Sequence, residues 1–266
     1  YRLKITITEK SGNDLTDYPV KIRLNTAWLI NNNYMSSTGD GIRFADDTGA
    51  TVYPHWREND YNSTETIYWV KIDSLSANGT KTIYAYFDPD ITTDASDATA
   101  VFIFFDDMET WSGWTQYGSG EVSQDDTRAY DGTYSAHKTT ANDPNGAYKA
   151  IGMTLGRDIC LEFWVNRNSN YSGGAVDRIG LIDDNGDGYG WRYDHSGDEI
   201  GIDKRDDYSG TALTEVSATD YMDKWVVEQY TVKSNGELIA RRYVDGELNG
   251  EATTTHTTYS SFTRVY

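Results

Sequence analysis

The chain is poor in cysteine, proline, basic residues and long apolar runs, and each shortage narrows what it can be. With one cysteine, Cys160, no intrachain disulfide can form. Cys160 falls in a strand-like stretch, where a small buried thiol is expected. Nowhere do 18 apolar residues follow one another, so we expect no membrane-spanning helix. The chain opens directly on a strand pattern, so we expect a mature, processed product.

The net charge argues against nucleic acid as a partner, and the residue composition favours β structure. The 23 basic residues stand against 42 acidic ones, which gives a formal net charge of -19. Such a surface repels phosphate backbones and excludes nucleic acid as a partner, whereas divalent cations and neutral glycans are compatible with it. The 21 tyrosines and 8 tryptophans, with only 4 prolines, favour β structure. A length of 266 residues allows two ordinary domains, each with its own core.

Alternating apolar and polar residues mark short strands in the first third of the chain. In Arg2–Thr8 the apolar residues share one face, which predicts a strand buried on one side. Asn78-Gly79 predicts a hairpin turn. The other expected strands are Val20–Leu24, Gly41–Ala45, Thr51–Trp56, Thr66–Ile72 and Thr80–Phe87. Six short strands predict a small antiparallel, Ig-like β-sandwich over residues 1–90, followed by a linker over residues 91–100.

This first part resembles a known family in several blocks that follow one another in order. The blocks are Tyr1–Ile7, Leu15–Val20, Gly41–Phe44 and Lys81–Phe87. They are similar to the uncharacterised β domain that opens many archaeal and bacterial surface proteins. The resemblance implies an extracellular location at the cell surface. It implies no chemistry, because that family has none assigned.

A second β domain is expected over residues 101–266. The run Val101–Phe105 is apolar and leads directly into Asp106, Asp107 and Glu109, which predicts a buried first strand with carboxylates at its end. Strict alternation in Ile159–Val165 predicts another strand, and Ser234-Asn235-Gly236 predicts a hairpin. About ten strands in this part predict a concanavalin-like jelly roll. The whole chain is thus expected to be all-β, with two antiparallel sandwiches in tandem.

The second part resembles the laminin-G and carbohydrate-binding-module type of sandwich. The resemblance rests on Phe104–Glu109, Trp114, Asp131–Ser135 and Leu161–Val165. It implies a structural calcium ion held by Asp107, Glu109 and either Asp131 or a carbonyl near Tyr134. The terminal strand of that fold is missing from the pattern, so an open sheet edge is expected, which is a template for pairing with another chain.

A second calcium hypothesis comes from spacing alone. Asp183, Asn185 and Asp187 alternate before Gly188, and Asp194 follows at position 12. Calcium requires several oxygen ligands from a tightly turning loop, which this spacing supplies. An ordinary polar turn between strands explains the same residues, because Asp, Asn and Gly dominate turns.

Groups that could carry catalysis or sugar binding give a weaker signal. Glu162 and Glu228 lie singly in strands, and the four histidines are scattered without zinc spacing, so we predict no enzyme activity. Sugar binding would use an aromatic platform. Trp164, Trp191 and Tyr193 are the candidates, although core packing is the commoner explanation for tryptophans in strands.

These observations predict a surface protein with a structural or binding role rather than a catalytic one. The first hypothesis is an extracellular structural or adhesive subunit of a filament or layer, stabilised by calcium and self-associating or binding other surface proteins. A strand exchanged between subunits, carrying Leu3, Ile5 and Ile7, would fill the open edge. The alternative is a carbohydrate-binding module for glycans or cell-wall polysaccharide. A glycoside-active enzyme is the third possibility.

Overall fold

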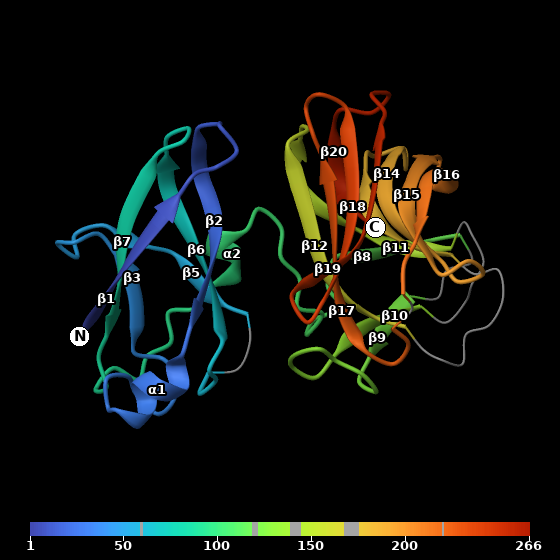
Figure 1. Cartoon of the computed structure of the whole chain (residues 1–266). Coiled ribbons are helices and arrows are strands. Elements are labelled where there is room, and N and C mark those ends of the chain that lie inside the picture. The colour runs from blue at the N-terminus through green and yellow to red at the C-terminus, as the bar shows by residue number, and fades with distance from the viewer. Residues whose placement is uncertain (59–60, 119–121, 139–144, 168–175, 220) are drawn as a thin grey trace. The chain divides into compact units, whose positions relative to one another are not determined.

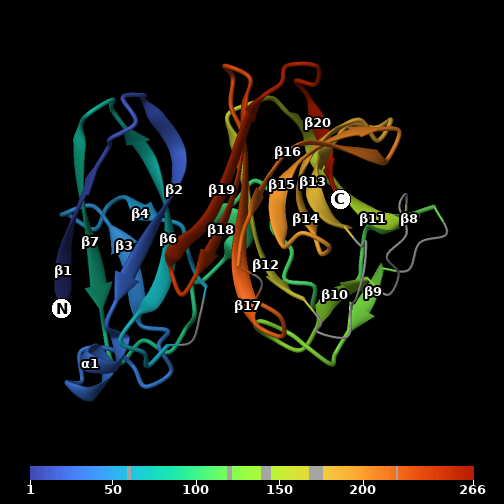
Figure 2. The same ribbon diagram turned by 45° about the vertical axis from the view of Figure 1, so that its right-hand side comes forward.

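The chain folds into two compact units, Tyr1–Phe105 and Asp106–Tyr266. The computed structural model describes residues 1–58, 61–118, 122–138, 145–167, 176–219 and 221–266. Its sheets are built from antiparallel strand pairs, which confirms the all-β prediction (Figures 1 and 2). We describe each unit by itself.

Within the described residues, no helix has both the length and the apolar character needed to cross a membrane.

Unit 1 is a sandwich of a four-stranded and a three-stranded sheet. Its elements are β1 (Arg2–Thr8), β2 (Leu15–Leu24), α1 (Thr26–Asn31), β3 (Ile42–Ala45), β4 (Val52–Tyr53), β5 (His55–Arg57), β6 (Thr66–Leu75), β7 (Thr80–Phe87) and α2 (Ala98–Val101). The sheets run in the orders β1-β7-β3-β4 and β2-β6-β5. Helix α1 was not expected, and it begins where the Asn25 side chain accepts a hydrogen bond from the Trp28 amide.

The core of unit 1 lies between its two sheets. Strand β6 buries every second residue, including Tyr68, Val70 and Ile72, as an alternating pattern requires. Tyr68 and Val70 join Phe44 and Ile83 of the facing sheet in one cluster. Burying each such side chain contributes about 1.5–3 kcal/mol, so this interface is the main stabilising feature of the unit.

Strand β1 is paired within its own unit. All seven of its residues pair with β7, from Arg2 opposite Tyr86 to Thr8 opposite Thr80. Of the three apolar residues predicted for strand exchange, Ile5 and Ile7 pack against the core and Leu3 is exposed. Donating this strand to another molecule would therefore break a complete ladder of hydrogen bonds.

The prediction of a buried strand at Val101–Phe105 was wrong. Residues 98–101 form α2, with Asp97 capping its first turn inside the stretch expected to be a linker, and the next strand begins only at Trp114. The rings of Phe102 and Phe105 instead pack against Trp56 of β5, at centroid distances of 5.7 and 4.8 Å. The apolar run thus covers a face of unit 1, which periodicity over five residues cannot distinguish from a strand.

Unit 2 contains two larger sheets and one small one. Its strands are β8 (Trp114–Tyr117), β9 (Val122–Asp125), β10 (Ser135–Lys138), β11 (Gly146–Leu155), β12 (Ile159–Asn166), β13 (Val176–Ile182), β14 (Gly188–Asp194), β15 (Glu199–Asp206), β16 (Ser209–Ser217), β17 (Trp225–Val232), β18 (Glu237–Val244), β19 (Glu247–Thr255) and β20 (Phe262–Val265). The seven-stranded sheet has the order β16-β15-β14-β13-β20-β11-β8, the four-stranded sheet β12-β17-β18-β19, and β9 pairs with β10.

The seven-stranded and four-stranded sheets bury their facing sides against each other. In β14, Tyr189, Trp191 and Tyr193 point inward and are fully buried. Trp191 meets Phe163 of β12 edge to face at 5.4 Å. Because side chains alternate along a strand, the residues between them, Gly190 and Arg192, lie on the outer face of the seven-stranded sheet.

Strand β20 occupies the place where we expected an open edge. Val265 pairs with Lys149 of β11 on one side and with Leu181 of β13 on the other. Within the described part of the chain, the edge strands of this sheet are instead β16 and β8. The motivation for strand donation into this sheet is therefore removed.

Candidate functional site

Glycines line the outer face of the seven-stranded sheet. They occupy outward positions on neighbouring strands: Gly180, Gly188, Gly190, Gly201 and Gly210. A Cβ on Gly190 would lie 2.0 Å from the Tyr266 hydroxyl oxygen, and one on Gly210 would lie 2.5 Å from Arg178 Nε and from Asp203 Oδ2. Glycine in a strand often marks a close approach by another group. Here it lets large polar side chains lie flat over the sheet.

A buried carboxylate between two arginines forms the centre of this face. Asp203 of β15 is 0% exposed. Its Oδ2 accepts a hydrogen bond from Arg178 Nε of β13, and its Oδ1 accepts one from Arg192 Nη1 of β14 at 3.2 Å. A carboxylate this deeply buried needs such cationic partners, because an unpaired buried charge is costly. We call Arg178, Arg192, Asp194, Asp203, Arg205 and Glu215 the outer-face array.

The two rim carboxylates complete the charge balance. Arg192 Nη2 lies 2.9 Å from Asp194 Oδ2 and 2.8 Å from Glu215 Oε1. Burial raises the pKa of Glu215, while the neighbouring Arg192 charge opposes that shift. The hydrogen bond from the Ser196 hydroxyl lowers the pKa of Asp194. The cations of Arg178, Arg192 and Arg205 thus face the carboxylates of Asp194, Asp203 and Glu215 in equal number.

The side chain of Tyr266 lies beneath Arg205. Tyr266 is 7% exposed, and the Arg205 guanidinium lies 5.0 Å from its ring centroid. Among the residues that the structure describes, its hydroxyl has no hydrogen-bond partner. Burial raises the pKa of Tyr266, so this hydroxyl remains protonated at neutral pH. A buried, unpartnered hydroxyl beside paired charges is a group that a polar ligand or water can satisfy.

Two of the three predicted sugar-stacking residues are not accessible. Trp191 and Tyr193 are 0% exposed and belong to the core, so this prediction was wrong for both. Alternation alone does not say which side of a strand faces the core. Trp164 is half-buried, and the Tyr130 ring stacks on it with a centroid distance of 3.7 Å and an interplanar angle of 12°. One face of the Trp164 ring is therefore covered.

The predicted calcium turn is closed by its own hydrogen bonds. Asp183 Oδ1 accepts from the amides of Asn185 and Asp187 at 2.8 and 3.0 Å, and Asp187 Oδ1 accepts from the Asp207 amide at 2.7 Å. Asp194 lies at the opposite end of β14, about 20 Å along the strand from the turn. The structure thus separates Asp194 from the other three predicted ligands.

The other predicted calcium ligands are brought together in part. Glu109 Oε1 accepts hydrogen bonds from the amides of Thr133 and Tyr134 at 2.7 and 2.8 Å, and these bonds lower the pKa of Glu109. Asp107 Oδ1 accepts from the Glu109 amide at 3.1 Å. Asp131, the third predicted ligand, forms no metal-ligating group of three with Asp107 and Glu109 within the described residues. Within the described residues, no three His, Cys, Asp or Glu side chains are grouped as a metal site would require.

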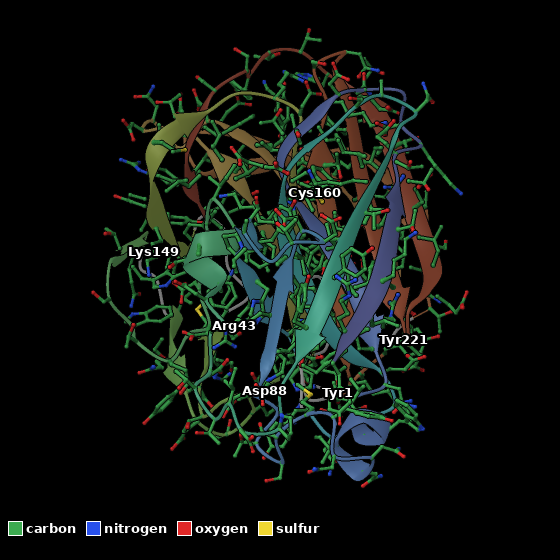
Figure 3. The ribbon with its side chains drawn as sticks, turned by 90° about the vertical axis from the view of Figure 1, so that its left-hand side faces the viewer. Tyr1, Arg43, Asp88, Lys149, Cys160 and Tyr221 are labelled. Carbon is green, nitrogen blue, oxygen red and sulfur yellow. The ribbon has the colours of Figure 1, made fainter. Side chains whose placement is uncertain are left out.

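Three other features of the chain are less suited to binding. Glu228, Arg167 and Arg242 form an ion-pair cluster between the sheets of unit 2, where all three side chains are at most 2% exposed. Cys160, labelled in Figure 3, is exposed on β12 rather than buried as predicted. Lys149, in the same figure, pairs with Asp106 at 2.7 Å. The ion pairs of Glu228 and of Lys149 thus have structural explanations.

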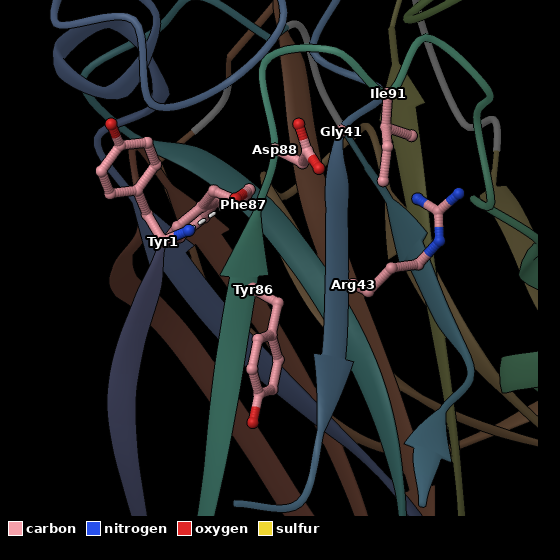
Figure 4. Close-up of a pocket in the computed structure, with 7 residues that line it drawn as sticks. All are labelled: Tyr1, Gly41, Arg43, Tyr86, Phe87, Asp88 and Ile91. Atoms are coloured by element: carbon pink, nitrogen blue, oxygen red, sulfur yellow. Dashed lines mark hydrogen bonds between the residues drawn. The ribbon is translucent and has the colours of Figure 1, made fainter. Parts of the chain in front are cut away.

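A pocket of about 260 Å³ lies in unit 1 (Figure 4). Tyr1 and Arg43 lie on opposite sides of Gly41 in this view. The Arg43 guanidinium donates to the carbonyls of Asp40, Ile42 and Thr93 at 3.0, 2.6 and 2.9 Å. Because these N–H groups already bond to backbone carbonyls, the pocket is a weaker candidate for a binding site than the outer-face array.

Comparisons with known proteins cover different parts of the chain. Residues 38–117 match a family model described as a domain of unknown function, DUF2341. An uncharacterized protein of Methanocaldococcus jannaschii is 37% identical over 169 residues, which are 61% of this chain and 17% of that protein. The chain thus spans about a sixth of that relative. A carbohydrate binding module, CBM66 from Bacillus subtilis, superposes with a TM-score of 0.42 and 15% identity over 57% of this chain and 85% of that structure.

Sequence reasoning missed the members of the outer-face array except Asp194, which it assigned to calcium. A usable signal was present, because Gly188, Gly190 and Gly201 alternate with bulky residues in strands that already alternate. Glycine at every second position marks a face on which something lies close to the backbone. What the pattern could not give is that Asp203 and Arg192, from different strands, meet on that face.

Proposed function

We propose that unit 2 is a carbohydrate-binding domain and that the saccharide lies on the outer face of the seven-stranded sheet. The observation that carries this proposal is the outer-face array itself. It combines buried, charge-paired guanidinium and carboxylate groups with the Tyr266 hydroxyl, which has no hydrogen-bond partner among the described residues. Of the hypotheses drawn from the sequence, this is the carbohydrate-binding alternative, at a site that the sequence did not indicate.

The chemistry of the array suits sugar hydroxyls. A hydroxyl group both donates and accepts, so it can bridge an arginine N–H and a carboxylate oxygen at once. Hydrogen bonds to charged groups are stronger than those between neutral ones. Because the array's charges balance, it does not call for a charged ligand. A neutral saccharide also suits a chain whose net charge is -19.

The array is also fixed before any ligand arrives. Arg192 is held by three carboxylates, and Asp203 by two guanidinium groups. Groups already held in place lose little conformational entropy on binding, which favours affinity. Catalysis is not part of the proposal, because the array's role here is to hold hydroxyl groups in place.

The test is a binding screen of the full chain against soluble neutral polysaccharides, followed by calorimetry on those that bind. Arg192→Ala is expected to weaken binding about 10- to 100-fold, since a charge-assisted hydrogen bond contributes about 1.5–3 kcal/mol. Glu215→Gln, at a partly exposed rim position, keeps the side-chain shape and is expected to weaken binding less.

Arg241→Ala is the matched control. Arg241 pairs with Glu251 at 2.5 Å on the four-stranded sheet and is 30% exposed, so its loss is expected to leave binding unchanged. Circular dichroism of each variant checks that it is folded. Absence of any saccharide binding, or equal loss in the Arg192 and Arg241 variants, contradicts the proposal.

A further inference from the structure

Three tyrosines gather at one end of the same outer face. Tyr117 comes from β8, Tyr148 from β11 and Tyr208 from the turn between β15 and β16. The ring centroids of Tyr117 and Tyr208 are 4.5 Å apart, and Tyr148 lies 6.5 Å from the first and 6.0 Å from the second. All three residues are half-buried, so each keeps part of its ring exposed. We call these three residues the tyrosine cluster.

The cluster lies on the same face of the sheet as the outer-face array. Tyr148 precedes Lys149, and Lys149 pairs with the inward-facing Val265, so the Tyr148 side chain points outward. The turn that carries Tyr208 lies against the β13–β14 turn, where the Tyr208 amide donates to the Gly186 carbonyl at 3.1 Å.

Two arginines connect the cluster to the array. Arg205, a member of the array, donates from Nη2 to the carbonyl of Tyr208. Arg264 of β20 donates from Nη1 to the Tyr208 hydroxyl at 2.9 Å, and its guanidinium lies 4.3 Å from the Tyr148 ring centroid. Arg264 also pairs with Asp184 at 3.2 Å, so the cluster, like the array, carries no excess of positive charge.

We propose that the tyrosine cluster is a second subsite for the same ligand, which is therefore an oligosaccharide of at least two neutral sugar units. This inference rests on the proposed function. One unit lies over the outer-face array, and the next lies against the tyrosines. A sugar ring has polar edges and a more apolar C–H face, and an aromatic side chain with a hydroxyl covers the second while bonding the first.

The experiment compares ligands of increasing length on the full chain. Glucose, galactose and mannose are titrated alongside their disaccharides and tetrasaccharides. For the sugar that binds, the wild-type affinity is expected to rise at least tenfold from the monosaccharide to the disaccharide. Tyr117→Ala is expected to remove most of that gain while leaving the monosaccharide affinity within about twofold.

Tyr130→Ala is the control, because Tyr130 is an exposed tyrosine stacked on Trp164 of the four-stranded sheet. It is expected to preserve the dependence on length. A wild-type affinity that does not change with length overturns the second subsite and leaves the proposed function standing. Equal weakening of every length by Tyr117→Ala also overturns it, because that result indicates a structural role. Failure of all these sugars to bind, with no other neutral glycan bound, overturns the proposed function itself.

Discussion

The guanidinium of Arg192 contacts three carboxylates, Asp194, Asp203 and Glu215, at distances from 2.8 to 3.2 Å. An isolated surface ion pair contributes little to stability, because water screens it. Here Asp203 is fully buried and Arg192 is 6% exposed, so the pair is held in place by its surroundings. Removing one partner would leave a buried charge uncompensated, which is strongly destabilising. For that reason the binding test pairs the Arg192 variant with the milder change at Glu215.

His55 makes the stability of unit 1 depend on pH. Its side chain is 3% exposed and its ring contacts Phe44 at 5.2 Å. Burial lowers the pKa of His55 to about 4, and the charge of Arg43 adds to this effect. The unfolded chain binds a proton at this residue below about pH 6.5, whereas the folded unit does so only below about pH 4. Stability is therefore complete above pH 6.5 and falls as the pH drops from 6.5 to 4.

The expected loss is about 3 kcal/mol in the free energy of unfolding of unit 1 across that range. Hydrogen exchange of the slowest amides in β6 and β7 measures it. His55→Gln removes the ionisable ring and is expected to flatten this part of the pH profile. An unchanged slope in the variant would show that another group is responsible.

The side of a strand that faces the core was predictable only where the other side of the strand is polar. Leu3, Ile5 and Ile7 were correctly placed on one side of their strand. Trp191 was misjudged because residues on both faces of β14 are buried, its polar neighbour Arg192 among them. A strand buried on both sides gives no alternation from which the core side can be chosen.

At the scale of elements, the run after α2 belongs to unit 1. Phe102 packs edge to face against Trp56 of β5 and Trp69 of β6, at 5.7 and 5.5 Å. Phe102→Ala is expected to lower the free energy of unfolding of unit 1 by about 2 kcal/mol, because the apolar contact is lost. Hydrogen exchange is expected to quicken in β5 and β6 and to stay unchanged in β17 and β18. The opposite pattern would show that this stretch stabilises the second unit instead.

Hairpins were the elements best predicted from the sequence. Asn78-Gly79 joins β6 to β7, and Ser234-Asn235-Gly236 joins β17 to β18, with positive φ at Asn78 and Gly236. The turn residues allow only a few backbone conformations, so local sequence is sufficient. The order of strands across the sheets depends instead on contacts between distant segments, which no local pattern contains. Calcium binding, for which Glu109 was one predicted ligand, stays a prediction.

At the scale of the whole chain, two units with separate cores were expected from length and composition, and the strand content confirms the fold class. Self-association and an extracellular location stay predictions, and the chain spans 17% of the length of its relative. The strongly acidic composition contrasts with the charge balance of the outer-face array. Because the charges of the array balance, the proposed ligand is neutral.

The most direct measurement is a titration of the isotope-labelled full chain with the best-binding neutral oligosaccharide, followed by amide NMR shifts. We expect the largest shifts at outward-facing positions of β13, β14, β15 and β20, including Arg192, Asp203 and Tyr266, and extending to Tyr117 and Tyr208. Shifts confined to β12, β17, β18 and β19, or to unit 1, would contradict a saccharide on the outer face of the seven-stranded sheet.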